Sequence, residues 1–568
     1  MLKNKKVILG LNGWSERGHD ASAALLVGNK IIAFVEEERY TRKRYSYDSF
    51  PINSIAYCLK KAKISVDDID RIIFGWNMPE VYKLRNQKFP YTNDQLFEIL
   101  FPKSLYKYTK TKKIEFLDHH LSHISSALYL SGLNEASVLV LDGQGEDESG
   151  TVANYKGGKL VVLSKISISK SLGYMMEAAC KYIGLRTSDA GKLMGLAGHG
   201  KKSKIFTNII LNDNGYEIKN FPEDKQILGT DLDEQSVVTS HWIRFFKKNF
   251  PLSITKATEY DNSMGLIKTS LVFDQKHKDF AYSVQKTLEF VIIHLVKNLI
   301  NRTGCKDIVL SGGIALNCTT NGILISQRLV NRLYVMPATN DAGVSLGAAI
   351  YTAVNNYNYS FKQLNNVYLG NEYSDNEIAT ALKHFKVVYK KQNNICKTAA
   401  KAISNGKVIA WFQGAMEAGP RALGNRSIVA NPAIRKMHES VNEIKSRENW
   451  RPLAPSILEE YRGELFENSS FSPFMLQNHV VRKNWYKKIP AVVHTDRTSR
   501  YQSVTSDINP KYYKLIKEFH KITGLPIVMN TSFNIGGEPL VCTPEHAIRT
   551  FYSSAIDCMA IGNYWIKK

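Results

Sequence analysis

The sequence predicts an α/β protein of two domains, the first of them a duplicated fold. Strands rich in valine, isoleucine and leucine alternate with helices along the 568 residues. A strand, a glycine or acidic turn and a helix recur in both halves of the first 360 residues. A polar stretch over residues 355–372 then precedes a new α/β unit. The length also exceeds what a single hydrophobic core usually contains.

The first third begins with three strands, over residues 6–12, 22–27 and 30–38. A helix over residues 49–64 follows, for which Ser49 is the predicted cap and Pro51 lies in the first turn. Strands at 70–76 and 114–118 lead to a helix through 122–133, and further strands begin at residue 136. Valine and isoleucine enrichment at these positions favours buried strands.

The second third begins with a long periodic helix over residues 279–304, which Gly304 ends. The strand at 307–317 breaks on a glycine pair, and residues 333–351 form a strand, a polar turn and a small-residue helix. This order resembles the duplication of actin-like ATPases. The sequence therefore predicts a first domain over residues 1–360 and a second over residues 373–568.

Composition excludes several classes of protein. The seven cysteines are scattered without a C-x-x-C pair, which argues against a disulfide framework or a thiolate metal site and favours the cytoplasm. The most apolar helix is interrupted by His294 and Lys297, so no membrane association is expected. The net charge of +23 favours anionic ligands, but its lysines are dispersed, and nucleic acid is not the expected partner.

Three histidines stand close together in "DHHLSHISS". His119 and His123 are one helical turn apart and face the same way, a common half-site for a metal. Asp142 follows a buried strand, and Asp341 stands at a matching place in the second half. Two imidazoles and two carboxylates suit a divalent first-row ion. A solvated helix start is the alternative reading of the histidines.

Other candidate groups lie in turns. His19, between two strands, is a general-base candidate if it reaches a hydroxyl, although it could simply hydrogen-bond its own turn. The glycine-broken turns "GKLMGLAGHG" and "SGGIALNCTTNG" suit close backbone approach to a nucleotide, but each is a weak signal alone. In the second domain, arginines and lysines stand among glycine, proline and serine, a pattern that favours phosphate binding: Arg421, Arg426, Lys445, Arg451 and Arg500.

An ordered set of motifs covers nearly the whole chain: "EEERYTRKR", "HHLSH", "LDGQGE", "GKLMGLAGHG", "GPRALGNRS", "RENWRPLAPS" and "NTSFN". The set resembles the carbamoyltransferase family that includes nodulation and antibiotic-tailoring O-carbamoyltransferases. The resemblance implies an actin-like (ASKHA, Kae1-like) N-terminal domain that transfers a carbamoyl group. It also implies a YrdC-like C-terminal domain that makes carbamoyladenylate from carbamoyl phosphate and ATP.

The same resemblance implies roles for individual residues. Fe²⁺ would sit on His119, His123, Asp142 and Asp341, with His19 as the base, and ATP would bring Mg²⁺. Carbamoyl phosphate and ATP would be held in the C-terminal domain by Arg421, Lys445, Arg451, Arg500, Asn530 and Ser532. Nucleotide contacts in the N-terminal domain would come from Arg44, Lys192, Gly195, Gly312, Gly313 and Asn317. A homodimer is the assembly that such relatives suggest.

Two residues and the net charge bear on the choice of acceptor. Arg17 stands where aminoglycoside-modifying members carry an acid, and Asp233 is a further acceptor contact. These residues and the net charge favour a neutral or anionic hydroxyl compound, such as a sugar of a glycoconjugate or an antibiotic. The alternatives are a tRNA threonylcarbamoylation enzyme and, in another class, a basic nucleic-acid-binding protein without turnover.

Overall fold

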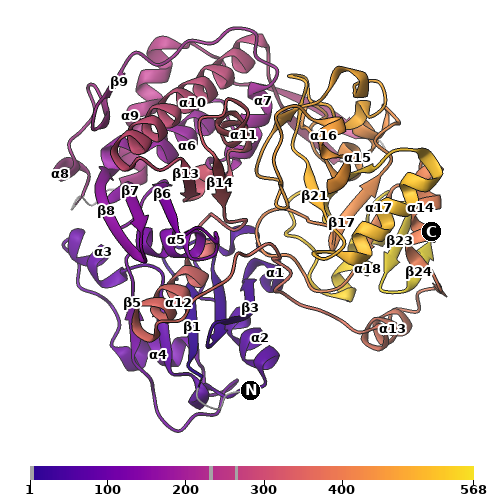
Figure 1. Ribbon diagram of the computed structural model, residues 1–568, viewed down its shortest axis with the longest axis horizontal. Coiled ribbons are helices and arrows are strands. Elements are labelled where there is room, and N and C mark those ends of the chain that lie inside the picture. Colours follow the sequence, from indigo (N-terminus) through magenta and orange to yellow (C-terminus); the bar gives the residue numbers. More distant parts are fainter. Residues whose placement is uncertain (1–4, 229–233, 262–265) are drawn as a thin grey trace.

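Two lobes make up the computed structural model, which describes residues 5–228, 234–261 and 266–568 (Figure 1). Elements β1 to α12 form the N-terminal lobe, and α13 to β24 form the C-terminal lobe. Residues 358–374, between α12 and α13, carry no helix or strand. No helix of the described ranges is long and apolar enough to cross a membrane.

The first N-terminal sheet has five strands in the order β3-β2-β1-β4-β5. β1 pairs antiparallel with β2 and parallel with β4, and β4 pairs parallel with β5. The core strands β1 and β2 are buried along their whole length, as their apolar sequences predict. The bounds are β1 Val7–Asn12, β2 Ser22–Val27, β3 Lys30–Glu36, β4 Arg71–Phe74 and β5 Ile114–Phe116.

The second sheet repeats this topology. Its order is β14-β13-β6-β7-β8, with β6 antiparallel to β7 and parallel to β13. The predicted duplication is therefore confirmed, because β6, β7, β8, β13 and β14 correspond to β1, β2, β3, β4 and β5. The bounds are β6 Glu135–Leu141, β7 Glu148–Lys156, β8 Lys159–Ser167, β13 Asp307–Ser311 and β14 Arg332–Val335.

The two copies are joined through the helices that follow their last strands. Helix α5 (His119–Leu128) follows β5, and α12 (Ala342–Tyr357) follows β14. The two helices pack closely because α12 carries small residues. At Gly347 a Cβ atom would lie 1.8 Å from the backbone oxygen of Ser122, so a larger residue does not fit. This contact fixes the starts of both helices relative to each other.

The predicted cap of the first helix was wrong. Helix α2 (Ile52–Ala62) begins after Pro51, and the hydroxyl of Ser49 donates to the carbonyl of Tyr47 instead. The buried carboxylate of Glu37 takes the capping role, since it accepts hydrogen bonds from the backbone N–H groups of Asn53 and Ser54. A tertiary contact has therefore replaced the local cap.

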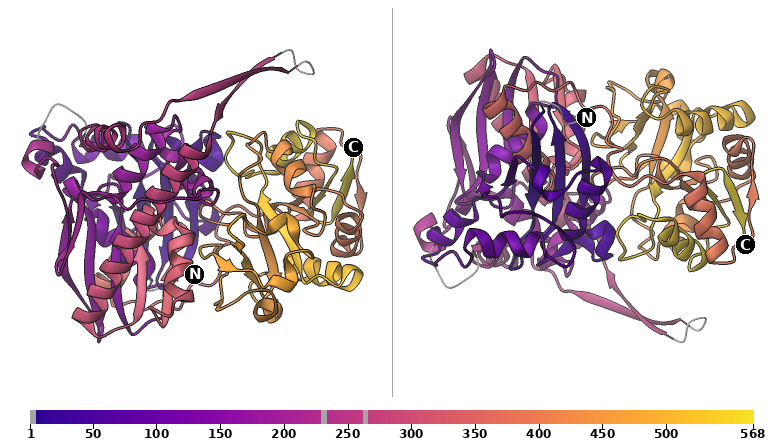
Figure 2. Two further views of the ribbon diagram at one scale, coloured as in Figure 1. Left: turned by 90° about the horizontal axis from the view of Figure 1, so that it is seen from above. Right: turned by 90° about the horizontal axis from the view of Figure 1, so that it is seen from below.

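The remaining N-terminal elements pack around the two sheets, and α6, α7 and α10 border the cavity described below. The long predicted helix is present as α10 (Gln275–Thr303), and Gly304 ends it in a left-handed conformation, as expected. The other helices are α1 Glu38–Thr41, α3 Met78–Leu84, α4 Asn93–Leu100, α6 Leu172–Tyr182, α7 Ala190–Ala197, α8 Asp224–Ile227, α9 Glu234–Asn249 and α11 Cys318–Ser326. Two hairpins, β9–β10 (Ile209–Asn212, Gly215–Ile218) and β11–β12 (Thr255–Asp261, Leu266–Val272), complete the lobe, and β11–β12 projects away from it (Figure 2).

The C-terminal lobe is built on one mixed sheet of eight strands, in the order β15-β24-β23-β16-β17-β22-β18-β21. The mixed α/β architecture predicted for this part is confirmed. The predicted strand at residues 386–390 is reduced to β15, because Val388 is exposed and has no core to join. The bounds are β15 Lys390–Lys391, β16 Ile409–Phe412, β17 Arg426–Ala430, β18 Ala454–Leu458, β21 Gln502–Val504, β22 Ile527–Ser532, β23 Cys558–Ile561 and β24 Tyr564–Lys567.

Helices cover both faces of this sheet. Ile409 and Trp411 of β16 pack with α14 and α17, whereas Ala410 and Phe412 pack with α13 and α18 on the other face. The helices are α13 Asp375–His384, α14 Ile395–Ser404, α15 Met437–Ile444, α16 Arg462–Leu465, α17 Pro510–Thr523 and α18 Pro544–Tyr552; β19 (His479–Val480) and β20 (Thr498–Ser499) form a small ribbon.

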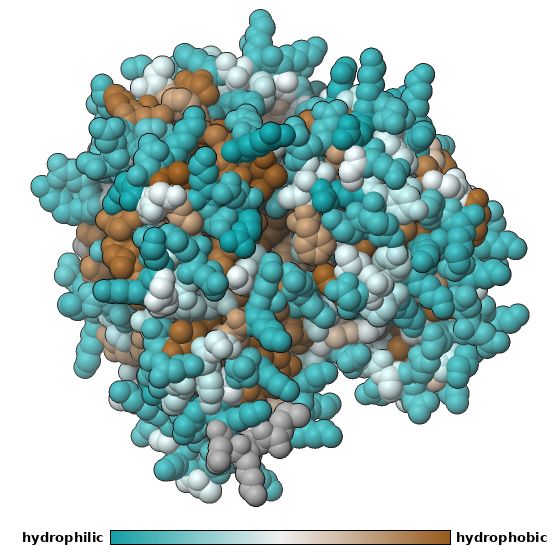
Figure 3. All heavy atoms as spheres, in the orientation of Figure 1, coloured by the Kyte–Doolittle hydropathy of each residue, from teal (hydrophilic) through white to brown (hydrophobic). Residues whose placement is uncertain are grey.

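The lobes share packing where they meet. The largest apolar cluster of the N-terminal lobe continues into the C-terminal lobe through Ala418, Leu423 and Leu476. On the face drawn in Figure 3, hydrophilic residues predominate, and hydrophobic residues gather in a recess at the junction of the two lobes. The junction is therefore a packed interface around a hollow.

Candidate active site

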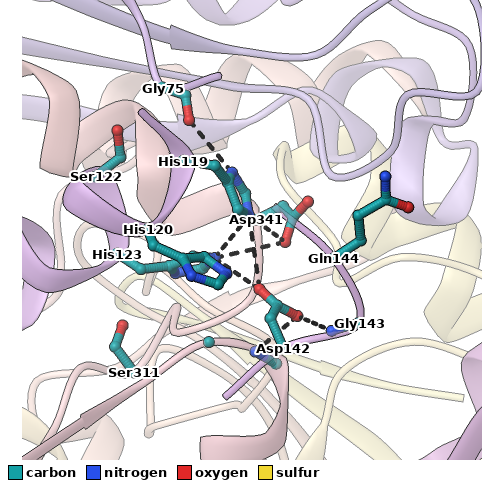
Figure 4. A network of polar contacts seen from close by, with 12 residues as sticks. Gly75, His119, His120, Ser122, His123, Asp142, Gly143, Gln144, Ser311 and Asp341 are labelled. Atoms are coloured by element: carbon teal, nitrogen blue, oxygen red, sulfur yellow. Dashed lines mark hydrogen bonds and ion pairs between the residues drawn. The ribbon is translucent and has the colours of Figure 1, made fainter. Parts of the chain in front are cut away.

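Four predicted metal ligands meet in the N-terminal lobe (Figure 4). One ligand atom from each of His119, His123, Asp142 and Asp341 lies within 4.8 Å of all the others. The Nε2 atom of His123 is 2.8 Å from Oδ2 of Asp142 and 3.7 Å from Oδ1 of Asp341. Both imidazoles are fully buried. We call these four residues the metal-site cluster.

The histidines are held by the start of α5. Asp118 caps the helix by accepting from the N–H of Leu121. The buried carboxylate of Glu146 accepts from the backbone N–H of His119. The Nδ1 atom of His119 lies 3.3 Å from the carbonyl oxygen of Gly75, a contact that places the proton on Nδ1 and leaves Nε2 available as a ligand.

The carboxylates come from two further strand ends. Oδ1 of Asp142 accepts from the N–H groups of Gly143 (2.8 Å) and Gly313 (3.2 Å), which directs Oδ2 towards the histidines. Asp341 directly precedes α12. The duplication corrects the sequence interpretation here: Asp142 and Asp341 follow strands of the same sheet. The position that matches Asp341 is that of His119, since each begins the helix after its copy's fifth strand.

The electrostatics of the cluster favour a bound cation. Burial lowers the pKa of His123, but the carboxylates of Asp142 and Asp341 outweigh it and raise that pKa to about 9. Burial opposes ionisation of Asp142, yet the imidazoles of His119 and His123 hold its pKa well below the usual range. Two buried carboxylates with two imidazoles make a donor set that fits a first-row divalent ion. The residues present therefore fit the predicted metal.

His19 lies beside this cluster. Its Nε2 atom is 3.9 Å from Oδ2 of Asp341, its Nδ1 atom is 3.2 Å from Oδ2 of Asp20, and 46% of its side chain is exposed. Desolvation opposes the charged ring, but the carboxylates of Asp341 and Asp20 raise the pKa of His19 to about 10. The imidazole thus faces the cavity from the edge of the metal-site cluster. Arg17 is exposed on the same loop, and Asp233 lies outside the described residues.

A continuous cavity of about 1710 Å³ runs from the metal-site cluster into the C-terminal lobe. Asp142, Asp341 and His19 line it at one end. Five basic side chains line it at the other end, and we call them the basic cluster: Arg421, Lys445, Arg447, Arg451 and Arg500. Sites predicted in different domains therefore open on one cavity.

The basic cluster is a set of like charges that the surrounding protein only partly neutralises. Burial and then the charge of Arg500 lower the pKa of Arg421, and burial with Arg451 and Arg500 lowers that of Arg447. Burial and the neighbouring arginines hold the pKa of Lys445 well below its usual range. The Nε atoms of Arg421 and Arg500 are buried without a hydrogen-bond partner among the described residues. Such a cluster favours a polyanion.

The predicted asparagine and serine lie in the same part of the cavity. Lys445 donates from Nζ to the hydroxyl of Ser532 (3.0 Å) and to Oδ1 of Asn534 (2.6 Å). Asn530 donates to the carbonyl of Ala422 (3.1 Å), and both Asn530 and Ser532 line the cavity. Arg426 does not line it, because its guanidinium is fully buried and donates to the carbonyl of Gln413.

Most of the nucleotide contacts predicted in the N-terminal lobe line the cavity, but one does not. Five of them line the cavity: Arg44, Lys192, Gly195, Gly313 and Asn317. Lys192 lies 3.2 Å from Asp189 and 3.7 Å from Glu448 of the other lobe. Gly312 lies outside the lining and packs on the backbone of Leu141, where a Cβ atom would come within 2.3 Å. Its role in this fold is close packing against β6.

Two side chains that line the cavity were not predicted from the sequence. Arg447 stands two residues after Lys445 and belongs to the basic cluster, so the density of basic residues in "KSRENWR" was a usable signal. Trp76 lines the cavity, and its ring centroid lies 3.8 Å from that of His119. No spacing rule pointed to Trp76, because its place depends on the pairing of β4 with β5.

Known proteins match this chain over both lobes. Family models for the carbamoyltransferase N-terminus and C-terminus match residues 8–350 and 400–568. Nodulation protein NolNO of Sinorhizobium fredii is 34% identical over 97% of this chain and 79% of its own. 3'-Hydroxymethylcephem-O-carbamoyltransferase of Amycolatopsis lactamdurans is 25% identical over 97% of this chain and 98% of its own. The crystal structure of T. kodakarensis HypF matches 62% of this chain and 48% of that chain at 13% identity and a TM-score of 0.37. The chain therefore belongs to the carbamoyltransferase family and is an enzyme that transfers carbamoyl groups.

Proposed function

We propose that this enzyme makes carbamoyladenylate from carbamoyl phosphate and ATP in its C-terminal lobe and transfers the carbamoyl group to a small-molecule hydroxyl in its N-terminal lobe. The single observation that carries this proposal is the shared cavity, which has a cluster for polyanions at one end and a metal-site cluster at the other. The O-carbamoyltransferase named among the relatives supports a hydroxyl acceptor.

The basic cluster suits the activation step. Water would cleave carbamoyl phosphate to phosphate and carbamate, and a carbamate oxygen would then bond to the α-phosphorus of ATP. The bond from that phosphorus to the pyrophosphate oxygen breaks, so pyrophosphate leaves. Charge develops on phosphate oxygens throughout, and the guanidinium groups of Arg421, Arg447 and Arg500, which line the cavity, would bind it. We assign Mg²⁺ to the ATP phosphates.

The metal-site cluster suits the transfer step. His119, His123, Asp142 and Asp341 would hold a divalent ion, for which we propose Fe²⁺. When bound, this ion supplies Lewis acidity towards an oxygen of the activated carbamoyl group. Nδ1 of His19 lies 3.2 Å from Oδ2 of Asp20, which would orient the ring. An ion held by Asp341 would offset the negative charge that raises the pKa of His19, so that Nε2 could accept the proton of the acceptor hydroxyl. The new bond joins the acceptor oxygen to the carbamoyl carbon, and AMP leaves.

The side chains of the cavity wall near His19 indicate the charge and shape of the acceptor. Arg17 is exposed at this wall and contributes a positive charge, and Trp76 presents a half-buried aromatic surface beside His119. A cationic side chain at the wall repels polycationic acceptors, whereas an aromatic surface packs against the apolar face of a sugar. We therefore propose a neutral or anionic hydroxyl compound with a sugar-like ring as the acceptor.

The experiment that tests this function needs no acceptor. The purified protein is mixed with ATP, Mg²⁺ and Fe²⁺, with and without carbamoyl phosphate, and the released pyrophosphate is measured. We expect pyrophosphate only when carbamoyl phosphate is present, together with carbamoyladenylate detected by mass spectrometry. ADP in place of pyrophosphate, or no nucleotide turnover, would contradict the proposal.

A further inference from the structure

The motif "EEERYTRKR" occupies the boundary between the two lobes, and its residues Glu36, Glu38, Arg39 and Arg44 line the shared cavity. It begins at the end of β3 and continues through α1. Four of its side chains, Glu36, Glu37, Glu38 and Arg39, are buried or nearly so; Arg39 is only 4% exposed. Buried charges of this kind are costly unless each is paired, so their partners show what the segment does.

Two of these charges hold one glycine of the other lobe. Oε1 of Glu36 accepts from the backbone N–H of Gly419 at 2.7 Å, and Arg39 donates to the carbonyl of the same residue at 2.8 Å. Arg39 also donates to Oε2 of Glu36 at 2.6 Å. Gly419 has a φ of +94°, and a Cβ atom there would lie 2.9 Å from the carbonyl oxygen of Pro337. Only glycine therefore fits this two-point contact.

The glycine held in this way belongs to a loop that carries one residue of the basic cluster. Arg421 follows Gly419 by two residues in the loop between β16 and β17. The fully buried carboxylate of Glu417 braces this loop by accepting from the N–H groups of Leu423 (2.7 Å) and Arg426 (3.2 Å). The contacts that fix Gly419 therefore also help to fix the position of Arg421.

Arg42 makes a second contact across the boundary. It donates to the carbonyls of Pro539 (2.7 Å) and Leu540 (2.6 Å). This segment is tied to the basic cluster, because the side chain of Asn534 donates to the carbonyl of Glu538 and accepts from Lys445. Arg39 and Arg42 therefore donate hydrogen bonds to two different loops of the C-terminal lobe, and both loops line the cavity.

The segment itself is fixed to the N-terminal lobe. Glu37 caps α2, as described above, and also accepts from the hydroxyl of Ser54 at 2.8 Å. Glu38 accepts from the N–H of Tyr45 at 2.7 Å and from Arg39 at 2.5 Å. Glu37 and Glu38 thus anchor the segment in the N-terminal lobe, whereas Glu36, Arg39 and Arg42 contact the C-terminal lobe.

We propose that residues 36–42 are an inter-lobe clamp that closes the wall of the shared cavity, with Arg39 and Arg42 as positioning residues that keep the activated carbamoyl group from water. This inference rests on the proposed function. If the wall opens, the oxygen of water bonds to the carbamoyl carbon, the bond from that carbon to the phosphate oxygen breaks, and AMP and carbamate are released.

The test compares wild type with Arg39→Lys and Arg42→Gln, using carbamoyl phosphate, ATP, Mg²⁺ and Fe²⁺ without acceptor. Wild type is expected to release one pyrophosphate per active site in a burst and then to turn over slowly, since the adenylate stays enclosed. In the variants the burst persists, and the subsequent steady release of AMP and pyrophosphate rises about tenfold, because the intermediate escapes. A merely structural defect would lower both phases.

Lys61→Ala is the matched control, because Lys61 and Glu372 form an exposed ion pair of 3.7 Å at the same junction. Its steady phase should equal that of wild type. Arg42 is partly exposed and leaves no buried charge when replaced, so Arg42→Gln decides the question if Arg39→Lys does not fold. A steady phase no faster than wild type in the folded variants would overturn the clamp. Absence of any burst in wild type would instead reject the proposed function.

Discussion

The two ends of the cavity carry opposite charges, and they differ in how far those charges find partners within the protein. At the metal-site cluster, two carboxylates and two imidazoles contact one another at 2.8–3.8 Å, so partners are already in place. At the basic cluster, five cations crowd together, and Glu448 is the carboxylate nearest Arg451, at 3.8 Å. The charges of the metal-site cluster are therefore paired within the protein, whereas those of the basic cluster repel one another.

This difference shows what each end requires from its ligand. The metal-site cluster needs a compact cation. Because the carboxylates raise the pKa of His123 to about 9, binding of a cation there should release a proton. The basic cluster needs an anion that relieves mutual repulsion, so binding there should stabilise the lobe. A substitution in one cluster should therefore leave ligand binding at the other cluster unchanged.

The largest effect is expected from Asp341→Asn. The substitution keeps the shape of the side chain but removes a charged ligand, so affinity for a divalent ion should fall by at least about a hundredfold. Carbamoyl transfer should be lost, whereas carbamoyl phosphate-dependent pyrophosphate release should persist. Metal content and pyrophosphate are the two measurements.

Asp307→Asn is the matched control for that variant. Asp307 lies on β13 of the same sheet but forms an exposed ion pair with Arg332, outside the cavity lining. Its metal content and both half-reactions should equal those of wild type. Loss of pyrophosphate release in Asp341→Asn would show that the two ends do not act separately.

Arg421→Met should have the converse effect. The variant loses a phosphate-binding guanidinium, so pyrophosphate release should fall by about a hundredfold while metal content stays unchanged. Removing one of five like charges should also raise the melting temperature of the ligand-free protein by roughly 1–2 °C. Arg302→Met, at an exposed arginine of α10, is the control and should change neither quantity. A lowered melting temperature would contradict the repulsion argument.

A smaller, pH-dependent effect should come from Lys445. Burial and the neighbouring arginines lower its pKa in the free enzyme, and a bound phosphate should raise it again. ATP binding should therefore take up a proton, and affinity should fall as the pH rises above the lowered pKa, by up to about tenfold per pH unit. Calorimetric titration in buffers of different ionisation enthalpy measures this uptake. Proton release on binding would show the opposite sign.

The sequence predicted both ends of the cavity but not their connection. His119 and His123 were recognisable because helical periodicity places them on one face. Asp142 and Asp341 were recognisable as acids after strands, yet their correspondence was misjudged, because only the sheet order shows that Asp341 matches His119. Local pattern predicts elements, whereas topology decides which elements are neighbours.

Tertiary contacts account for the remaining misses. Ser49 has the residue type of a helix cap, but Glu37 takes that role from the end of β3. The motif around Arg39 was noticed only as part of a family resemblance, since nothing in its spacing shows that Gly419, 380 residues away, is its partner. Contacts of such sequence separation cannot be read from propensity or periodicity.

The smallest effect is expected from Arg17→Glu, which tests the acceptor rather than the two clusters. Arg17 is exposed on the loop that carries His19, so the substitution changes the charge at the cavity wall by two units without disturbing a buried contact. An exposed charge near a binding site changes affinity only modestly, so the KM for an aminoglycoside should fall by roughly threefold to tenfold. The KM for a neutral sugar should stay unchanged. Carbamoyl transfer to each acceptor, measured by mass spectrometry at low and high salt, checks both expectations, because a charge effect weakens as salt rises. An aminoglycoside KM that did not respond to the substitution would place the acceptor away from Arg17 and leave the wall around Trp76 as its site.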